Sequence, residues 1–325
     1  MSVVQKLKNK KQQITDDWNS DIRFSKEYAK LRRRDTIFSS LRMKKQSDIA
    51  FEKREKYLIN YLTNSIEVVI NKYQDKRIQG EYVKNAPIWV CWWTGIETAP
   101  PIVKQCVNSI YKNANNHPVY LITDITYQNY IRIPDYILSK MESKKMGLAH
   151  FSDYLRVSLL EKYGGLWLDA TIFCSENISE QFFDSPFFTL KSPYTESRYA
   201  SKYQWVTFCL GGWKGNQFYS FVKEAFEEYW SKNEYAIDYL FFDYIIYLGR
   251  ENCPYIKELM DAIPENTPHR DDLQAAMNAR LPADRFDIVI KPDTGLYKLS
   301  WRETYSETTP DGNDSIYKYF ITMKE

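Results

Sequence analysis

The segment S152-DYLRVSLLEKYGGLWLDA-T171, residues 152–171, decides the fold of this 325-residue chain. Its first twelve residues carry apolar side chains at the three-to-four spacing of a helix, and Gly164 and Gly165 interrupt that pattern. The apolar run LWLDATIF, residues 166–173, then predicts a buried strand. A helix, a two-glycine break and a strand in quick succession are typical of an α/β sheet.

The flanking sequence repeats the alternation of strand and helix. Apolar runs predict strands at 88–93 and 118–123, and helical spacing predicts helices at 101–113, 134–143, 147–163, 216–230 and 236–248. Residues 205–213 resemble a strand, and 287–301 contain a late strand and a turn. We therefore expect an α/β fold, a sheet with parallel strands flanked by helices, whose ligands bind beyond the carboxyl ends of the strands.

The first 84 residues have a different character, with helical spacing and no strand pattern. They hold 20 Lys and Arg against 11 Asp and Glu, although the whole chain has a net charge of only +2. We predict a helical N-terminal extension, 1–84, before one α/β domain, 85–325. The basic helices suit an anionic membrane surface, oligomerisation or a solvated face equally well. Nucleic acid is disfavoured because no recognised binding motif accompanies the charge.

The cysteines and the hydropathy pattern bear on the compartment. The five cysteines are scattered without a Cys-x-x-Cys pair, which indicates neither a zinc site nor a disulfide framework. No apolar run approaches the roughly 20 residues of a membrane-spanning helix. We expect a reducing cytoplasm, at the inner face of the plasma membrane if the basic helices bind lipid.

The acidic residues of the deciding segment are the first candidates for chemistry. Asp169 falls where a buried strand ends, so it is expected to cap a turn, to be hydrogen-bonded or to hold a cation. Asp153 and Arg156 are spaced i,i+3 and project from one helix face. Such a pair is often a surface ion pair, and the combination with the glycines and Asp169 is what makes it specific.

That combination resembles the capsular polysaccharide synthesis family, which is close to glycosyltransferase family 32, and more distantly the glucosyltransferase domains of large clostridial toxins. The resemblance implies a Rossmann-like GT-A fold, in which S-D-x-x-R, a two-glycine break and an acidic D-x-D element end the nucleotide-binding strand. Ser152, Asp153 and Arg156 match the first part, and Asp169 is the first acid of the last. The second acid is replaced by Thr171.

The resemblance implies roles for these residues. Ser152, Asp153 and Arg156 would bind the donor sugar, and Asp169 would help to bind Mn²⁺ or Mg²⁺ on the diphosphate. Thr171 would join the metal site, directly or through water, because a hydroxyl is a poorer ligand than a carboxylate for such hard cations.

Further candidates lie outside the deciding segment. The resemblance implies that Trp92 stacks on the uracil ring, with Trp89 or Trp93 as alternatives. It also brings Lys298, Ser300 and Trp301 toward the diphosphate, where Lys298 would stabilise the departing charge. Asp243 sits in an apolar helix pattern, so it either faces the donor sugar or pairs with a buried Arg or Tyr.

The resemblance implies a hexosyltransferase that retains anomeric configuration. Its donor would be a UDP-sugar, UDP-glucose or UDP-galactose, and its acceptor a glycan or a polyprenyl-diphosphate-linked saccharide in capsule or surface polysaccharide synthesis. A convincing pair of catalytic carboxylates is not evident in the sequence, which argues against a glycosidase. The alternative is a non-catalytic module that binds sugar nucleotide or a membrane partner through the same fold.

Overall fold

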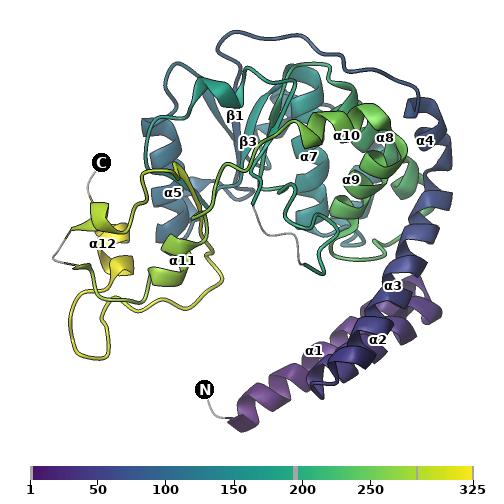
Figure 1. The fold of residues 1–325 in the computed structure, drawn as a ribbon, viewed down its shortest axis with the longest axis horizontal. Helices are drawn as coiled ribbons and strands as arrows, with labels where there is room; N and C mark the ends of the chain where they lie inside the picture. The colour runs from purple at the N-terminus through teal and green to yellow at the C-terminus, as the bar shows by residue number, and fades with distance from the viewer. Residues whose placement is uncertain (1–2, 193–196, 283–284, 324–325) are drawn as a thin grey trace. The chain divides into compact units, whose positions relative to one another are not determined.

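A computed structural model describes residues 3–192, 197–282 and 285–323 (Figure 1). The chain forms two compact units. We call them the sheet unit and the helical unit, and each is made of three segments that are distant in sequence. The sheet unit comprises Lys76–Arg132, Ser152–Ser220 and Pro254–Glu325. The helical unit comprises Met1–Asp75, Ile133–Phe151 and Phe221–Cys253.

A five-stranded mixed sheet organises the sheet unit, with the order β2-β1-β3-β6-β5. β1 pairs in parallel with both β2 and β3, while β6 runs antiparallel to β3 and β5. The predicted α/β sheet is confirmed, and the antiparallel strands make it mixed. The strands are β1 (Ile88–Cys91), β2 (Val119–Ile122), β3 (Gly165–Leu168), β5 (Phe187–Thr189) and β6 (Cys209–Gly212).

Helices cover both faces of this sheet. Successive strand residues point to opposite sides, so neighbouring residues of one strand pack against different helices. Ile88 and Val90 belong to the same buried core as Ile102 and Cys106 of α5 (Pro101–Lys112). On the other face Trp89 packs against Tyr163, the last residue of α7 (Leu148–Tyr163), with ring centroids 5.5 Å apart. Figure 1 shows α5 on one side of β1 and β3 and α7 on the other.

Smaller elements complete the sheet unit. A separate two-stranded antiparallel sheet joins β4 (Ile172–Cys174) to β7 (Leu296–Lys298). The remaining helices here are α10 (Pro254–Asp261), α11 (Asp272–Ala276) and α12 (Ile316–Thr322). Short 3₁₀ turns lie at Ile96–Thr98, Tyr127–Asn129, Glu180–Phe182 and Phe286–Ile288.

The single strand predicted over residues 166–173 is wrong in one respect. The run is broken at Asp169, whose carbonyl accepts a hydrogen bond from the N–H of Ile172, 2.9 Å away. β3 ends before this turn in the large sheet, and β4 begins after it in the small one. Both halves are buried, so the apolar pattern is continuous even though the strand partners change.

Glycine is required for a steric reason at the junction of α7 and β3, residues 164 and 165. Gly164 and Gly165 both have positive φ angles, +68° and +96°. A Cβ on Gly165 would lie 2.0 Å from the carbonyl oxygen of Pro87, which accepts the Leu166 N–H at 2.9 Å. Only glycine allows this approach, and the approach sets the register of β3 beside β1.

The helical unit confirms the helices expected near the N-terminus and those expected at 134–143, 216–230 and 236–248. α2 begins at the cap Ser25, whose hydroxyl accepts the N–H of Tyr28, and it packs against α3. α9 also packs against α3, and it begins at Phe241, later than the predicted residue 236. The helices are α1 (Val3–Phe24), α2 (Lys26–Ser40), α3 (Lys44–Ser65), α4 (Glu67–Tyr73), α6 (Asp135–Glu142), most of α8 (Gln217–Lys232) and α9 (Phe241–Asn252).

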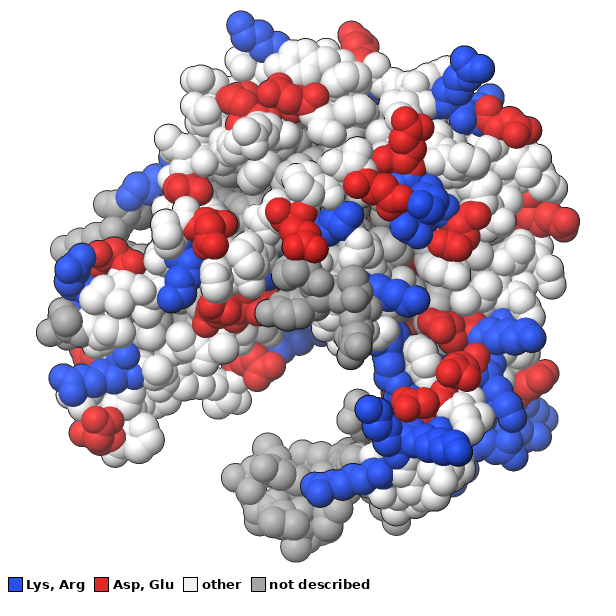
Figure 2. Space-filling view, viewed as in Figure 1, with Lys and Arg blue, Asp and Glu red and all other residues white. Residues whose placement is uncertain are grey.

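Charge is concentrated on the first helices of the helical unit. Figure 2 shows Lys and Arg side chains crowding this part of the chain, with fewer Asp and Glu between them. Within the described residues, no helix has the length and apolar character needed to cross a bilayer.

Candidate functional site

The site is centred on Asp169, at the carboxyl end of β3. Its N–H donates to the carbonyl of Phe208 at 2.9 Å, which holds the turn after the strand against the segment before β6. Because β1 and β3 are parallel neighbours, Cys91 and Trp92 at the end of β1 reach the same edge of the sheet. This is the edge where the sequence predicted ligand binding.

Both carboxylate oxygens of Asp169 accept hydrogen bonds from positively charged or polar donors. Oδ1 accepts from Nη2 of Arg156 at 3.2 Å and from Nε1 of Trp167 at 3.0 Å. Oδ2 accepts from Nζ of Lys298 at 2.9 Å. The carboxylate is therefore held between two cations, and its side chain is only 30% exposed.

The surroundings keep Asp169 ionised. Burial would raise the pKa of its carboxyl, but the cations of Lys298 and Arg156 and the indole of Trp167 outweigh burial and hold that pKa well below its usual range. A carboxyl of this kind cannot serve as a general acid near neutral pH, which is the role a glycosidase would require of one of its two acids.

Arg156 links Asp169 to the predicted donor-binding helix. Its Nη1 lies 2.5 Å from Oδ1 of Asp153, one turn earlier on α7, and its guanidinium lies 4.9 Å from the ring centroid of Trp167. Burial would lower the pKa of Arg156, but Asp153 and Asp169 outweigh it and raise that pKa. Ser152 precedes Asp153 on the same helix and is half-buried.

Lys298 reaches the site from the other end of the chain. The pairing of Ile172 with Lys298 in the β4–β7 sheet brings β7 beside the turn after β3. Nζ of Lys298 then donates both to Asp169 and to the hydroxyl of Thr171, at 2.8 Å, and lies 4.7 Å from the ring centroid of Phe208. Thr171, at 8% exposure, is the more buried of the two oxygen-bearing partners.

A third cation, Arg270, was not predicted. Its carbonyl accepts the Lys298 N–H at 2.8 Å, and its guanidinium lies 5.7 Å from the ring centroids of both Phe208 and Tyr203. The residue is 7% exposed, and Nε donates to Asp271 at 3.3 Å. Nη1 is buried without a hydrogen-bond partner among the residues that the structure describes. Arg270 follows no recognisable motif, so the sequence carried no signal for it.

Two tryptophans that are far apart in the sequence are in contact at this edge of the sheet. Trp92 and Trp301 lie edge to face, with ring centroids 5.7 Å apart and planes at 83°. Trp301 is 44% exposed, while Nε1 of Trp92 is buried with no hydrogen-bond partner in the described part of the chain. Together they offer an aromatic surface at the end of β1.

The alternative tryptophans are placed differently. Trp89 is 1% exposed and donates from Nε1 to the carbonyl of Gly164 at 3.0 Å, so it belongs to the core. Trp93 packs against Tyr127, with ring centroids 5.5 Å apart.

Ser300 has a structural place near Trp301. Its N–H donates to Oε1 of Gln274 at 2.8 Å, and its hydroxyl accepts the N–H of Arg302 at 3.2 Å. Asp243 is half-buried in the first turn of α9 and belongs to the helical unit, so its contact with a donor sugar stays a prediction.

The oxygen atoms at this edge that could act as metal ligands do not fit a directly bound divalent metal. The two oxygens predicted to bind it, on Asp169 and Thr171, both accept hydrogen bonds from the Lys298 ammonium. Mg²⁺ would need those same oxygens at about 2.1 Å, together with several more oxygen ligands. In the described residues no cluster of three or more His, Cys, Asp or Glu side chains is placed to hold a metal.

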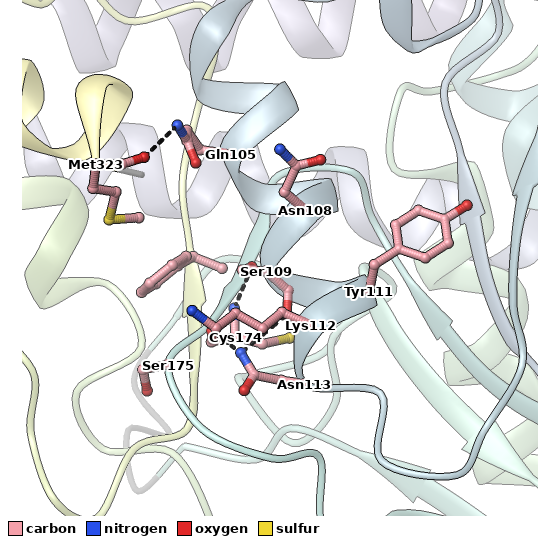
Figure 3. Close-up of a pocket in the computed structure, with 10 residues that line it drawn as sticks. Gln105, Asn108, Ser109, Tyr111, Lys112, Asn113, Cys174, Ser175 and Met323 are labelled. Atoms are coloured by element: carbon pink, nitrogen blue, oxygen red, sulfur yellow. Dashed lines mark hydrogen bonds between the residues drawn. The ribbon is translucent and has the colours of Figure 1, made fainter. Parts of the chain in front are cut away.

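A separate cavity of about 640 Å³ lies beside α5 and β4 (Figure 3). Gln105 of α5 and Asn113, which follows that helix, line it, and Nδ2 of Asn113 donates to the carbonyl of Cys174 at 2.9 Å. None of the predicted site residues lines this cavity, so its size does not bear on the chemistry at Asp169.

Comparison with known proteins agrees with the resemblance inferred from the motifs. The profile of the family described as "Capsular polysaccharide synthesis protein" matches residues 39–320. No curated protein matches the chain. Among solved structures, the PaToxG glycosyltransferase is weakly similar, with 14% sequence identity and a TM-score of 0.35 over 66% of this chain and 84% of that one.

Proposed function

Because this chain belongs to the capsular polysaccharide synthesis protein family, we propose that it is a glycosyltransferase acting on a nucleotide sugar. The proposed reaction transfers a hexose, glucose or galactose, from its UDP donor to a glycan or a lipid-linked saccharide, with retention of configuration. The observation that carries the proposal is the cluster of Asp169, Lys298 and Arg270 at the carboxyl edge of the sheet.

The chemistry of this cluster suits a diphosphate leaving group. When the bond between the sugar C1 and the β-phosphate oxygen breaks, negative charge grows on the phosphate, and fixed cations stabilise it. Lys298 and Arg270 are such cations. The acceptor oxygen forms the new bond to C1, and its proton passes to the departing phosphate, so no side chain has to act as the base.

The same edge has groups suited to the rest of the donor. Trp92 and Trp301 offer aromatic faces of the kind that stack on a uracil ring. Asp153 and Arg156 offer one carboxylate and one guanidinium for sugar hydroxyls. We propose that the tryptophan pair binds the uracil on one side of the diphosphate and that Asp153 and Arg156 bind the sugar on the other.

The test is a screen of UDP-glucose, UDP-galactose and their N-acetyl forms, with UDP release as the readout. Wild-type protein is expected to release UDP from one of these donors, and Asp169→Asn to lose most of that turnover. Undiminished turnover by Asp169→Asn would remove Asp169 from the mechanism. Binding of UDP without turnover of any donor would instead favour the non-catalytic module, which Thr171 in place of an acid keeps in consideration.

A basic and apolar surface in the helical unit supports a membrane-bound acceptor. The hairpin tip, residues 41–45, joins α2 to α3 where Arg42 adopts a positive φ of 57°. Leu41 is 63% exposed and Met43 37%, and Arg42, Lys44 and Lys45 beside them are also exposed. Exposed apolar side chains among cations suit an anionic lipid surface, since each cation contributes about 1 kcal/mol there.

We propose that the hairpin tip contacts anionic lipid at the inner face of the plasma membrane. Binding of the full chain to phosphatidylglycerol vesicles is expected to weaken by about 10- to 100-fold in the variant Leu41→Ser/Arg42→Ser/Lys44→Ser. The variant Lys53→Ser/Lys56→Ser, which removes two exposed cations of α3 away from the tip, should weaken binding far less. Equal losses would mean that the basic helices bind lipid without a special role for the hairpin tip, and unchanged binding in both variants would contradict the proposal.

A further inference from the structure

The ammonium of Lys298 stands where the resemblance would place a metal ion. We call Asp169-Ala170-Thr171 the D-x-T element. The ammonium donates hydrogen bonds to both of its polar side chains, at 2.9 Å from Oδ2 of Asp169 and 2.8 Å from Oγ1 of Thr171. We propose that Lys298, assisted by Arg270, replaces the divalent cation in binding the donor diphosphate, so that donor binding and transfer need no metal. This inference rests on the proposed function.

Charge argues for the replacement. The Asp169 carboxylate already faces two cations, Lys298 and Arg156. A divalent cation on the same carboxylate would stand within a few ångströms of both, and like charges this close repel strongly in a partly buried site. With Thr171 in place of an acid, this element holds no second carboxylate to offset that repulsion.

The hydrogen-bonding capacity of Lys298 also fits. An ammonium has three N–H donors, and the described contacts use two of them, one on Asp169 and one on Thr171. The ammonium is 4.7 Å from the centroid of the Phe208 ring, which favours a fixed cation. Its side chain is 25% exposed, so the third donor can reach a phosphate oxygen.

Arg270 supplies the second charge. Its guanidinium shares the ring of Phe208 with Lys298, and its main chain is joined to Lys298 by a hydrogen bond. Nη1, buried without a partner in the described residues, is a donor that an anion can satisfy. Two fixed monovalent cations carry the charge of one divalent ion. Thr171, a weak metal ligand, serves here to orient the ammonium.

The first experiment measures UDP binding by calorimetry with the wild-type chain, once in EDTA and once with added Mn²⁺. We expect the dissociation constant to agree within about twofold, and UDP-sugar turnover to survive EDTA. A tenfold or larger gain from Mn²⁺, or loss of turnover in EDTA, would overturn the inference while leaving the proposed glycosyltransferase intact. Failure to bind UDP in either condition would overturn both.

Variants then assign the effect to the lysine. Lys298→Met keeps the length of the side chain and removes its charge, and we expect it to weaken UDP binding in EDTA by about 10- to 100-fold. Lys298→Arg should recover part of the loss, which a merely structural role would not predict. Lys112→Met, at an exposed lysine of α5, is the control and should bind as the wild type does. Wild-type affinity in folded Lys298→Met would contradict the proposal.

A double variant reverses the exchange. Thr171→Asp with Lys298→Ala restores two acids and removes the ammonium, so UDP binding should become dependent on Mn²⁺, with at least a tenfold difference between EDTA and metal. Circular dichroism spectra and unfolding midpoints confirm that each variant is folded. If the folded double variant bound UDP equally well in EDTA and in Mn²⁺, Lys298 would not be the substitute for the metal.

Discussion

Gly165 lies so close to Pro87 that a Cβ on the glycine would stand 2.0 Å from the proline carbonyl oxygen. The same carbonyl accepts the N–H of Leu166, which starts the alignment of β3 beside β1. The strand that leads to Asp169 is thus positioned by a contact at its other end. The site depends on a residue that carries no side chain.

Gly165→Ala is therefore expected to be strongly destabilising. The methyl group meets main-chain atoms that cannot move aside, and φ is +96°, where an L-residue is strained. We expect a loss of about 3 kcal/mol or more in the free energy of unfolding, measured by urea denaturation. Gly147→Ala is the control, because a Cβ there meets nothing within 4 Å. Similar stability of the two variants would refute this account of the glycine pair.

Asp169→Asn is expected to lower stability as well as turnover. The change removes the negative partner of Lys298 and Arg156 and should cost about 1 to 3 kcal/mol near neutral pH. The pKa of Asp169 is lowered on folding, so its contribution is fully present above the usual carboxyl pKa of about 4 and is lost as the pH falls below that value.

The corresponding measurement compares the free energies of unfolding of wild type and Asp169→Asn across the acid range. The gap between the two should be constant from about pH 7 down to about pH 5 and should narrow below about pH 4. A gap that widened toward acid would mean that the carboxyl is protonated in the native state.

The contribution of Asp21 to stability should change with pH in the opposite direction. Burial raises the pKa of Asp21 to about 6, although Arg32, with Nη1 2.8 Å away, lowers it. The folded chain therefore holds a proton on Asp21 that the unfolded chain has lost, and stability falls as the pH rises from about 4 through 6. For a pKa shift of that size, the free energy of unfolding should fall by about 2 to 3 kcal/mol over this pH range. Asp21→Asn should abolish that fall. Helix unfolding followed by circular dichroism at a series of pH values checks it.

The five thiols are expected to be inert in the native protein. Burial raises the pKa of Cys91 to about 12, and Asp169 adds to the effect. Burial likewise raises the pKa values of the other four cysteines, Cys106, Cys174, Cys209 and Cys253. A thiolate is the reactive form, so a disulfide reagent at about pH 8 should label none of them until guanidinium chloride unfolds the chain, when all five should react. Rapid labelling of Cys91 in the native state would show that the carboxyl end of β1 is open to solvent.

Much of the sheet unit could be predicted because its elements are short, buried and periodic. β1, β2, α5 and α7 all lie where apolar runs or helical spacing predicted them. β5 was missed because its three residues, Phe187–Thr189, are too short for a period to be recognised. The break after β3 was missed because both of its sides are buried, and hydrophobicity does not record a change of partner.

The site was predictable to a similar degree. Asp169, Arg156 and Lys298 were expected near one another and do converge. Arg270 was not, because it enters from a loop whose position depends on the pairing of β7, a contact between distant parts of the chain. The engagement of Thr171 by a lysine could not be foreseen either, since a motif names the residues and leaves out their partners.

The pairing of Ile172 with Lys298 has a consequence for how the molecule is made. The D-x-T element leaves the ribosome first, and Lys298 follows 127 residues after Thr171. At about 5 to 20 residues per second, the element waits roughly 6 to 25 seconds for its lysine. During that interval the Asp169 carboxylate lacks one of its two cations. A nascent chain that ends before Lys298 has the strand and the acid of this site but lacks the proposed cation for the diphosphate, so in the proposed mechanism activity would begin only after Lys298 has been synthesised.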